Sequence, residues 1–369
     1  MAMRALPPTA VMATGLPTLQ KAKEDCPRVS SAAYQLVLQA ERQAVDSHAQ
    51  GHTSGAATNL INARIVGWLL LNPVDDNPAP FVSEVLAANK RGDSTQKINE
   101  LGQVYLNYIV SLFKQYKPST PTRSPPIELS RSLFDTLRND ILAELKPSLT
   151  DDVTTKAQAL LRDDFRCMVT GKIDLHGVSL HLVEMPPPSP TTVTECAHIF
   201  PQSLGFPSGG HYGADEDKNH VATTWAILNR FGYTGMEEEL AGSSIHRLEN
   251  VLTLDAVLHH FFDQLYLWFE AVPDKPHTYR IETRPPYFPD PSEVPREVTF
   301  TSRYNLPLPS PKYLRIHAAC CRIAHLSGAV EYLDKVYRDR EDLGVLAEDG
   351  ASAPVLSHLL QRLSSIPTE

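Results

Sequence analysis

The amino-acid sequence predicts an α+β protein in which N- and C-terminal α-helical regions flank a small unit of strands and one short helix. Apolar residues recur three and four positions apart along much of the first and last parts of the chain, as in helices that bury one face. Between these parts, a β-branched and apolar stretch from Thr191 to Phe200 predicts a strand. A second strand is predicted from Asn250 to Leu254, followed at once by a helix that runs to Asp263. Strand, connection, strand and helix therefore form one small unit.

Composition and charge narrow the class of protein. The 369 residues are 42% hydrophobic and 21% charged, which is typical of a globular protein rather than a disordered one. This length exceeds what one core needs, so two or three structural units are expected. The formal net charge of −9 argues mildly against a protein whose whole surface binds nucleic acid, because phosphate binding depends on clustered Lys and Arg. A local basic patch is compatible with this net charge. No run approaches the roughly 18 apolar residues of a membrane span, so no membrane partner is expected.

The cysteines predict an intracellular protein, either cytoplasmic or nuclear. They form no C-x-x-C pair, and the interrupted N-terminal stretch does not predict a secretory leader. An odd count of five fits a reducing compartment. The cysteines are Cys26, Cys167, Cys196, Cys320 and Cys321.

The first 150 residues divide into a tail and a helical domain. Residues 1–29 have prolines among small residues and predict a disordered tail. Residues 30–150 predict a helical domain with helices at 33–45, 56–71, 95–116 and 129–145. No catalytic spacing appears in this domain, so we interpret it as a scaffold that presents the central unit and offers a surface for a protein partner.

The central unit is predicted to span residues 151–285 and the C-terminal region 286–369. The central unit begins with a helix at 151–164 and a hairpin whose second strand is Val178–Val183. A connection of about fifty residues, with helices near 222–231 and 236–240, separates the two motif strands and is far longer than a hairpin loop. A second hairpin is expected at 265–272 and 277–283. A proline-rich linker then leads to helices at 312–338 and 354–363, which are expected to pack with the helical domain.

The phase of the helix after the second strand selects its polar face. Asp255 is the expected N-cap, and apolar residues three and four apart form a stripe along one side. His259 and Asp263, four apart, share a neighbouring face. His259 is therefore available for a polar role.

The phrases Ala197-His198-Ile199, Asn250-x-Leu252-x-Leu254 and His259-x-x-Phe262, in this order, resemble the HNH endonucleases with the ββα-metal fold. The resemblance is closest to the HNH-type proteins of fungal genomes and covers roughly residues 160–285. It implies a small ββα-metal HNH unit with added β-hairpins.

The resemblance implies hydrolysis of DNA phosphodiester bonds with one divalent metal ion: Mg, Mn, Ni or Zn. His198 would be the general base that takes a proton from water, a role suited to a side chain with a pKa near neutrality. His259 is the implied metal ligand, with Asn250 and Asp263 as further ligands. Asn250 would also orient the loop or polarise His198, so the implied catalytic residues are His198, Asn250 and His259.

One position departs from the family pattern. Many HNH enzymes have an aspartate or histidine ligand immediately before the catalytic histidine, where this chain has Ala197. The ion then has fewer protein ligands unless Glu195, Asp263 or a residue of the long connection supplies one. Two alternatives therefore stay open beside the nuclease. One is a catalytically inactive HNH scaffold that acts as a protein-interaction module, and the other is an HNH fold with different metal-assisted chemistry.

Overall fold

The structure is a computed structural model of the 369-residue chain. It describes residues 15–50, 55–74, 77–89, 92–114, 129–143, 151–185, 188–205, 214–284 and 294–342, without the side chains of 214–218 and 339–342. Backbone contacts divide the chain into two compact units. Unit 1 comprises Met1–Ser111, Arg230–Gly232 and Arg322–Glu369, and unit 2 comprises Leu112–Asn229 and Tyr233–Cys321.

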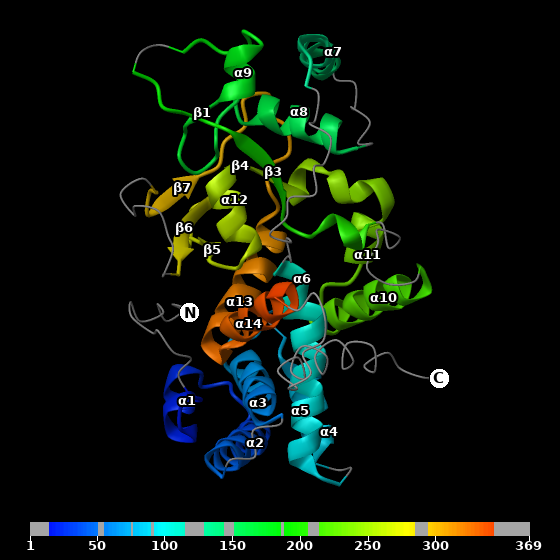
Figure 1. Cartoon of the computed structure of the whole chain (residues 1–369), viewed down its shortest axis with the longest axis vertical. Helices are drawn as coiled ribbons and strands as arrows, with labels where there is room; N and C mark the ends of the chain where they lie inside the picture. Colours follow the sequence, from blue (N-terminus) through cyan, green and yellow to red (C-terminus); the bar gives the residue numbers. More distant parts are fainter. Residues whose placement is uncertain are drawn as a thin grey trace. The chain divides into compact units, whose positions relative to one another are not determined.

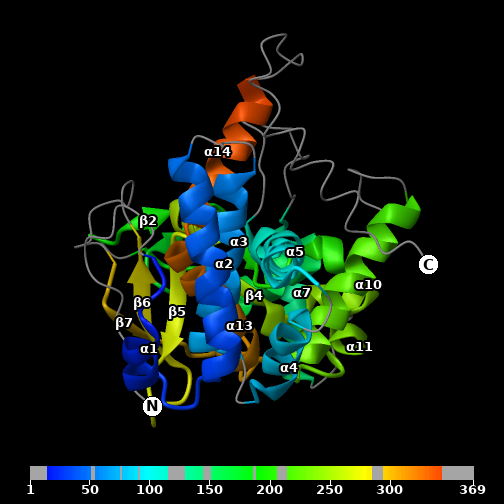
Figure 2. The same ribbon diagram turned by 90° about the horizontal axis from the view of Figure 1, so that it is seen from below.

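The elements in the described part of unit 1 are all helices. Its elements are α1 (Leu19–Asp25), α2 (Ser31–Ala49), α3 (Ala56–Leu71), α4 (Ala79–Ala88), α5 (Ser94–Tyr105), the π-helical segment η1 (Leu106–Val110) and α14 (Ala329–Asp342); α6 (Ser111–Phe113) continues from η1. Helix α2 contacts α3, α4 and α5 (Figure 2). Gly102 of α5 permits close packing on α3, because a Cβ atom there would lie 2.2 Å from the backbone oxygen of Asn62.

Most of the predicted N-terminal helices are present. The helices expected at 33–45 and 56–71 are α2 and α3, and the one expected at 95–116 is α5, η1 and α6 as far as the description reaches. Where the sequence predicts a disordered tail, the structure has α1, which Thr18 caps by accepting a hydrogen bond from the backbone of Lys21. The hydroxyl of Tyr34 also donates to the carbonyl of Pro17 at 2.8 Å, so this segment is fixed to α2. Residues 1–14 lie outside the described part.

Unit 2 mixes short helices with short strands. Its helices are α7 (Arg131–Leu142), α8 (Asp152–Arg162), α9 (Leu175–Ser179), α10 (Ala214–Arg230), α11 (Met236–Leu240), α12 (Ala256–Asp263) and α13 (Pro311–Ser327), with 3-10 turns η2 (Gln202–Leu204), η3 (Gly242–His246) and η4 (Leu248–Asn250). The last residue of α10 and the residues of α13 from Arg322 onward are assigned to unit 1. Its strands are β1 (Ile173–Asp174), β2 (Thr191–Thr192), β3 (Thr194–His198), β4 (Val251–Asp255), β5 (Leu267–Ala271), β6 (Thr278–Thr283) and β7 (Glu297–Thr299). The α+β class is confirmed.

The centre of unit 2 is the antiparallel pair β3–β4 with α12 directly after it (Figure 1). His198 pairs with Val251 at one end of the ladder, and Thr194 pairs with Asp255 at the other. Helix α12 contacts both strands. Its predicted N-cap is confirmed, since the side chain of Asp255 accepts a hydrogen bond from the backbone of Val257 at 2.9 Å.

The predicted strand Val178–Val183 is wrong, because helix α9 begins at Leu175 and ends at Ser179. Asp174 starts this helix: its carboxylate accepts hydrogen bonds from the backbone N–H groups of His176 and Gly177. The same carboxylate also accepts from the backbone and hydroxyl of Thr194. A buried cap with two further partners on β3 therefore outweighs the strand preference of the β-branched residues.

The predicted strand from Thr191 to Phe200 is two strands. Residues 191–192 pair in parallel with β1, whereas 194–198 pair antiparallel with β4. The stretch changes partners at Val193, whose carbonyl accepts a hydrogen bond from Ala256. The periodicity of a sequence indicates which residues of a strand are exposed, but it does not indicate which strand they pair with. The break at Val193 could therefore not be predicted.

The remaining described elements follow the predictions with two differences. Helix α8 matches the helix expected at 151–164, and β5 and β6 match the hairpin expected at 265–283, which gains β7 as a third antiparallel strand. The long helix expected at 312–338 is broken into α13 and α14 at Gly328, whose φ of +83° is a left-handed conformation that ends a helix. The helix expected at 354–363 lies outside the described residues.

Candidate functional site

The three predicted catalytic residues are carried by neighbouring parts of the β3–β4–α12 arrangement. His198 is the last residue of β3, Asn250 immediately precedes β4, and His259 lies in α12. Ala197, paired with Leu252, is fully buried in the β3–β4 ladder and has no donor atom for an ion.

Asn250 is a fully buried bridge between two backbone segments. Its carboxamide oxygen accepts from the N–H of Phe200 at 2.9 Å, and its nitrogen donates to the carbonyls of Phe200 and Ile245 at 3.0 and 2.9 Å. These bonds fix the chain just after His198 to the chain just before His246. In this geometry Asn250 positions the site, and its role as a metal ligand stays a prediction.

His259 lies between two carboxylates. Its Nδ1 is 2.5 Å from an oxygen of Glu195 on β3, and its Nε2 is 3.3 Å from an oxygen of Asp263, one turn further along α12. The predicted face shared by His259 and Asp263 is thus confirmed. Glu195 adds an acidic group from the neighbouring strand, so an imidazole and two carboxylates lie together.

His198 is buried, with 7% of its surface exposed, and contacts two polar side chains. Its Nε2 is 3.3 Å from Nδ1 of His246, and its Nδ1 is 3.4 Å from the side-chain nitrogen of Gln202. Burial lowers the pKa of His198 to about 4, although the carboxylate of Asp152 acts in the opposite direction. The imidazole is therefore neutral at neutral pH and keeps one nitrogen lone pair.

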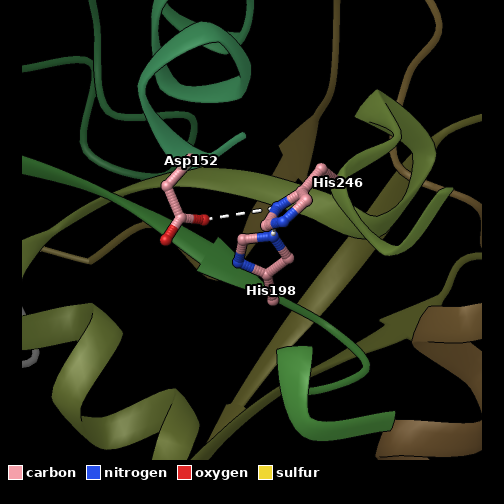
Figure 3. A group of neighbouring side chains, drawn as sticks. All are labelled: Asp152, His198 and His246. Atoms are coloured by element: carbon pink, nitrogen blue, oxygen red, sulfur yellow. Dashed lines mark hydrogen bonds and ion pairs between the residues drawn. The ribbon is translucent and has the colours of Figure 1, made fainter. Parts of the chain in front are cut away.

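Asp152 completes a group of three donors around His198. Its Oδ1 lies 3.3 Å from Nδ1 of His246, and one ligand atom from each of Asp152, His198 and His246 lies within 4.8 Å of the others. Figure 3 shows the three side chains pointing toward one another from separate segments. The hydrogen bond from His246 holds the pKa of Asp152 below its usual range. These three residues are positioned as possible ligands of one ion.

Sequence reasoning missed Asp152 and His246. Asp152 follows the helix-capping Asp151 and looks like an ordinary acidic residue of a helix first turn. His246 lies in a 3-10 turn without any metal-ligand spacing to another histidine. Neither residue has a local signature, because three-dimensional folding alone brings them to His198. His211, which lies in the long connection, is outside the described residues.

Within the described parts of the chain, the group of three around His198 is the set of His, Cys, Asp and Glu that converges closely enough to share an ion. The predicted ligands His259 and Asp263 contact each other, but Glu195 meets the opposite nitrogen of the same ring. The nearby Cys196 is a poor ligand candidate, because burial raises the pKa of its thiol to about 12. The site thus contains an oxygen-rich group at His259 and a nitrogen-rich group at His198.

One comparison with known proteins gives a match, over part of the chain. No described helix has the length and apolar character needed to cross a membrane. No curated protein and no solved structure matches the chain significantly. Residues 167–270 match the model of a family described as HNH endonuclease. The match includes His198, His246, Asn250, His259 and Asp263 but begins after Asp152. Over this segment, which holds β3, β4 and α12, the chain is similar to the HNH endonucleases.

Proposed function

We propose that unit 2 is a divalent-metal-dependent endonuclease that hydrolyses DNA phosphodiester bonds. The observation that carries this proposal is the β3–β4–α12 arrangement inside the matched segment, which puts His198 and the carboxylate-flanked His259 on adjacent elements. A buried neutral imidazole beside an acidic, ion-attracting group is the pair of functions that water attack on a phosphate diester needs.

His198 is the proposed general base. Its neutral form has a lone pair that can take a proton from water. The low pKa of the protein alone makes it a weak base, but the negative charge of a bound phosphate diester favours the protonated imidazole and raises that pKa. Asn250 positions this side chain through its bonds to Phe200 and Ile245.

His259 and Asp263 are the proposed metal ligands, and Glu195 is the additional acidic group beside them. Nε2 of His259 and the carboxylate of Asp263 lie on one side of the ring, and Glu195 adds negative charge at the opposite nitrogen. This acidic surrounding suits Mg²⁺ or Mn²⁺, because these ions prefer oxygen donors. When bound, such an ion neutralises charge on the phosphate and the departing oxygen. The carboxylates of Glu195 and Asp263 hold the ring of His259 in place.

The test is plasmid nicking with Mg²⁺ or Mn²⁺. His198→Ala is expected to lower the nicking rate at least about 100-fold, since general-base catalysis contributes on this order. His181→Ala is the matched control, because His181 is an exposed histidine of the same unit and should leave the rate unchanged. Circular dichroism establishes that both variants are folded. Equal rates in His198→Ala and the wild type would sink this role for His198.

An inactive HNH scaffold that binds a protein partner through its helical region is the second candidate. It is favoured by the buried Ala197, which removes one common ligand position, and by the net charge of −9, which disfavours DNA. This candidate predicts no nicking by the wild type with any divalent ion, together with a specific partner that His198→Ala still captures.

Five free cysteines support a reducing compartment, the cytoplasm or nucleus, for either function.

A further inference from the structure

Two of the distances among Asp152, His198 and His246 match the edge of a metal tetrahedron, and all three ligand atoms lie within 4.8 Å of one another. Zinc binds histidine nitrogen and carboxylate oxygen at about 2.0–2.2 Å in tetrahedral sites, so two ligand atoms of one ion lie ~3.3–3.5 Å apart. Nε2 of His198 and Oδ1 of Asp152 are each 3.3 Å from Nδ1 of His246. Both pairs thus have the spacing of ligands on one ion.

Hydrogen bonding links these three side chains only weakly at Nδ1 of His246. Nδ1 of His246 faces both His198 and Asp152, but a ring nitrogen carries either one proton or one lone pair. It can donate to Asp152, accept from His198, or share a single N–H between the two, so at most one full hydrogen bond forms at that nitrogen. A shared cation satisfies the lone pairs of all three atoms together.

Buried bonds fix the three segments that carry these donors. The hydroxyl of Thr155 on α8 donates to the backbone carbonyl of His246 at 3.1 Å, which ties the helix of Asp152 to the turn of His246. Asn250 ties the chain after His198 to the carbonyl of Ile245. The side chain of Gln202 contacts both Oδ1 of Asp152 and Nδ1 of His198, at 2.5 and 3.4 Å. The donor atoms are therefore preorganised.

We propose that Asp152, His198 and His246 form a binding site for a zinc-class transition metal, separate from the oxygen-rich group at His259. Two imidazoles and one carboxylate favour Zn²⁺ or Co²⁺ over Mg²⁺, since nitrogen donors suit these softer ions. One of the three donors, Asp152, lies outside the segment that matches the HNH family.

Occupation of this site inhibits the proposed nuclease, and this second part rests on the proposed function. The ion bonds to Nε2 of His198 and so takes the lone pair that a general base needs to accept a proton. Zn²⁺ is then an inhibitor of the Mg²⁺-supported reaction instead of a substitute for Mg²⁺. His198 cannot serve as ligand and base through the same nitrogen at the same time.

Calorimetric titration of Zn²⁺ into the full chain, with Co²⁺ absorption as a geometric readout, tests the site. Wild type is expected to bind Zn²⁺ at this site, and Asp152→Asn should weaken that binding at least about 10-fold because one of three ligands is lost. The carboxylate is half-exposed, so this change should have little effect on folding. His246→Gln should weaken the binding further. His259→Gln removes the other group and should leave this binding unchanged. Tetrahedral Co²⁺ should give intense visible absorption in the wild type that Asp152→Asn loses.

Three results would overturn the site: no Zn²⁺ binding by folded wild type, equal binding by Asp152→Asn and wild type, or equal losses in His259→Gln and His246→Gln. Inhibition is tested separately by adding Zn²⁺ to the Mg²⁺ nicking reaction. Wild type should be inhibited, and Asp152→Asn should need at least about 10-fold more Zn²⁺; equal sensitivity would reject the inhibitory role. If wild type shows no nicking, the proposed function fails, while the titrations still decide the metal site.

Discussion

Single buried side chains set the electrostatic character of unit 2. His317 of α13 is fully buried and stacks on Phe262 of α12, with ring centroids 3.9 Å apart. Burial lowers the pKa of His317 to about 3. The pKa of a histidine in the unfolded chain is about 6.5. Between this pKa and the native pKa of about 3, the unfolded chain binds a proton at His317 and the native chain does not. Native stability therefore falls as the pH falls through this interval.

Removing this histidine should weaken the pH dependence of stability. From pH 7 to pH 5, the free energy of unfolding of His317→Gln should fall by about 2 kcal/mol less than that of the wild type. This value follows from the shift in the pKa of His317. Urea unfolding at the two pH values measures the difference. The glutamine destabilises the protein at both pH values, so only the change with pH counts. A change as large as that of wild type would contradict the assignment.

At the scale of elements, α8 acts as a support for the site. It carries Asp152 at its first residue and Arg162 at its last. The buried guanidinium of Arg162 donates to the carbonyls of Leu248 and Val251 at 2.8 and 3.1 Å, and it forms a bidentate pair with Asp163. The last turn of α8 is thereby attached to the start of β4. This attachment fixes the position of Asp152, the first residue of α8.

Arg162→Met should cost about 3–5 kcal/mol of unfolding free energy, because it leaves the buried carboxylate of Asp163 without its cation. Arg162→Met combined with Asp163→Asn should cost less than the single change, since no buried charge remains. Arg131→Met, which removes an exposed ion pair with Asp135, should cost at most about 1 kcal/mol. Chemical denaturation of the three variants checks this order, and a double variant less stable than Arg162→Met would contradict it.

The elements differ in how far the sequence alone could place them. Helix α12, its cap Asp255 and its polar face with His259 and Asp263 follow from local spacing, which is why they were predictable. Helix α9 was not, because its cap Asp174 is held by Thr194, a contact that no local pattern encodes. Asp152 and His246 were missed for the same reason: their meeting with His198 depends on tertiary packing. Local spacing thus predicted the shared face of His259 and Asp263, and the resemblance implied His198 and Asn250, but neither pointed to the other donors around His198.

At the scale of the whole molecule, two compact units with separate buried residues should unfold in two steps. Leu333 of α14 is fully buried in unit 1, so Leu333→Ala should destabilise that unit by about 2–5 kcal/mol. Differential scanning calorimetry should show one transition moving to lower temperature. The transition assigned to unit 2, identified by its shift in Arg162→Met, should stay in place. A single transition that both variants move would show that the units unfold together.

The position of Asp152 outside the family match has a consequence for modularity. A polypeptide cut at residues 167 and 270 would keep both strands and α12 but would lack α8, and with it Asp152, Thr155 and Arg162. Such a fragment retains the HNH-like motif but lacks the helix that contacts it and lies outside the matched segment. We therefore expect that β3, β4 and α12 cannot be moved to another protein by themselves, and that the preceding helix α8 has to be moved with them.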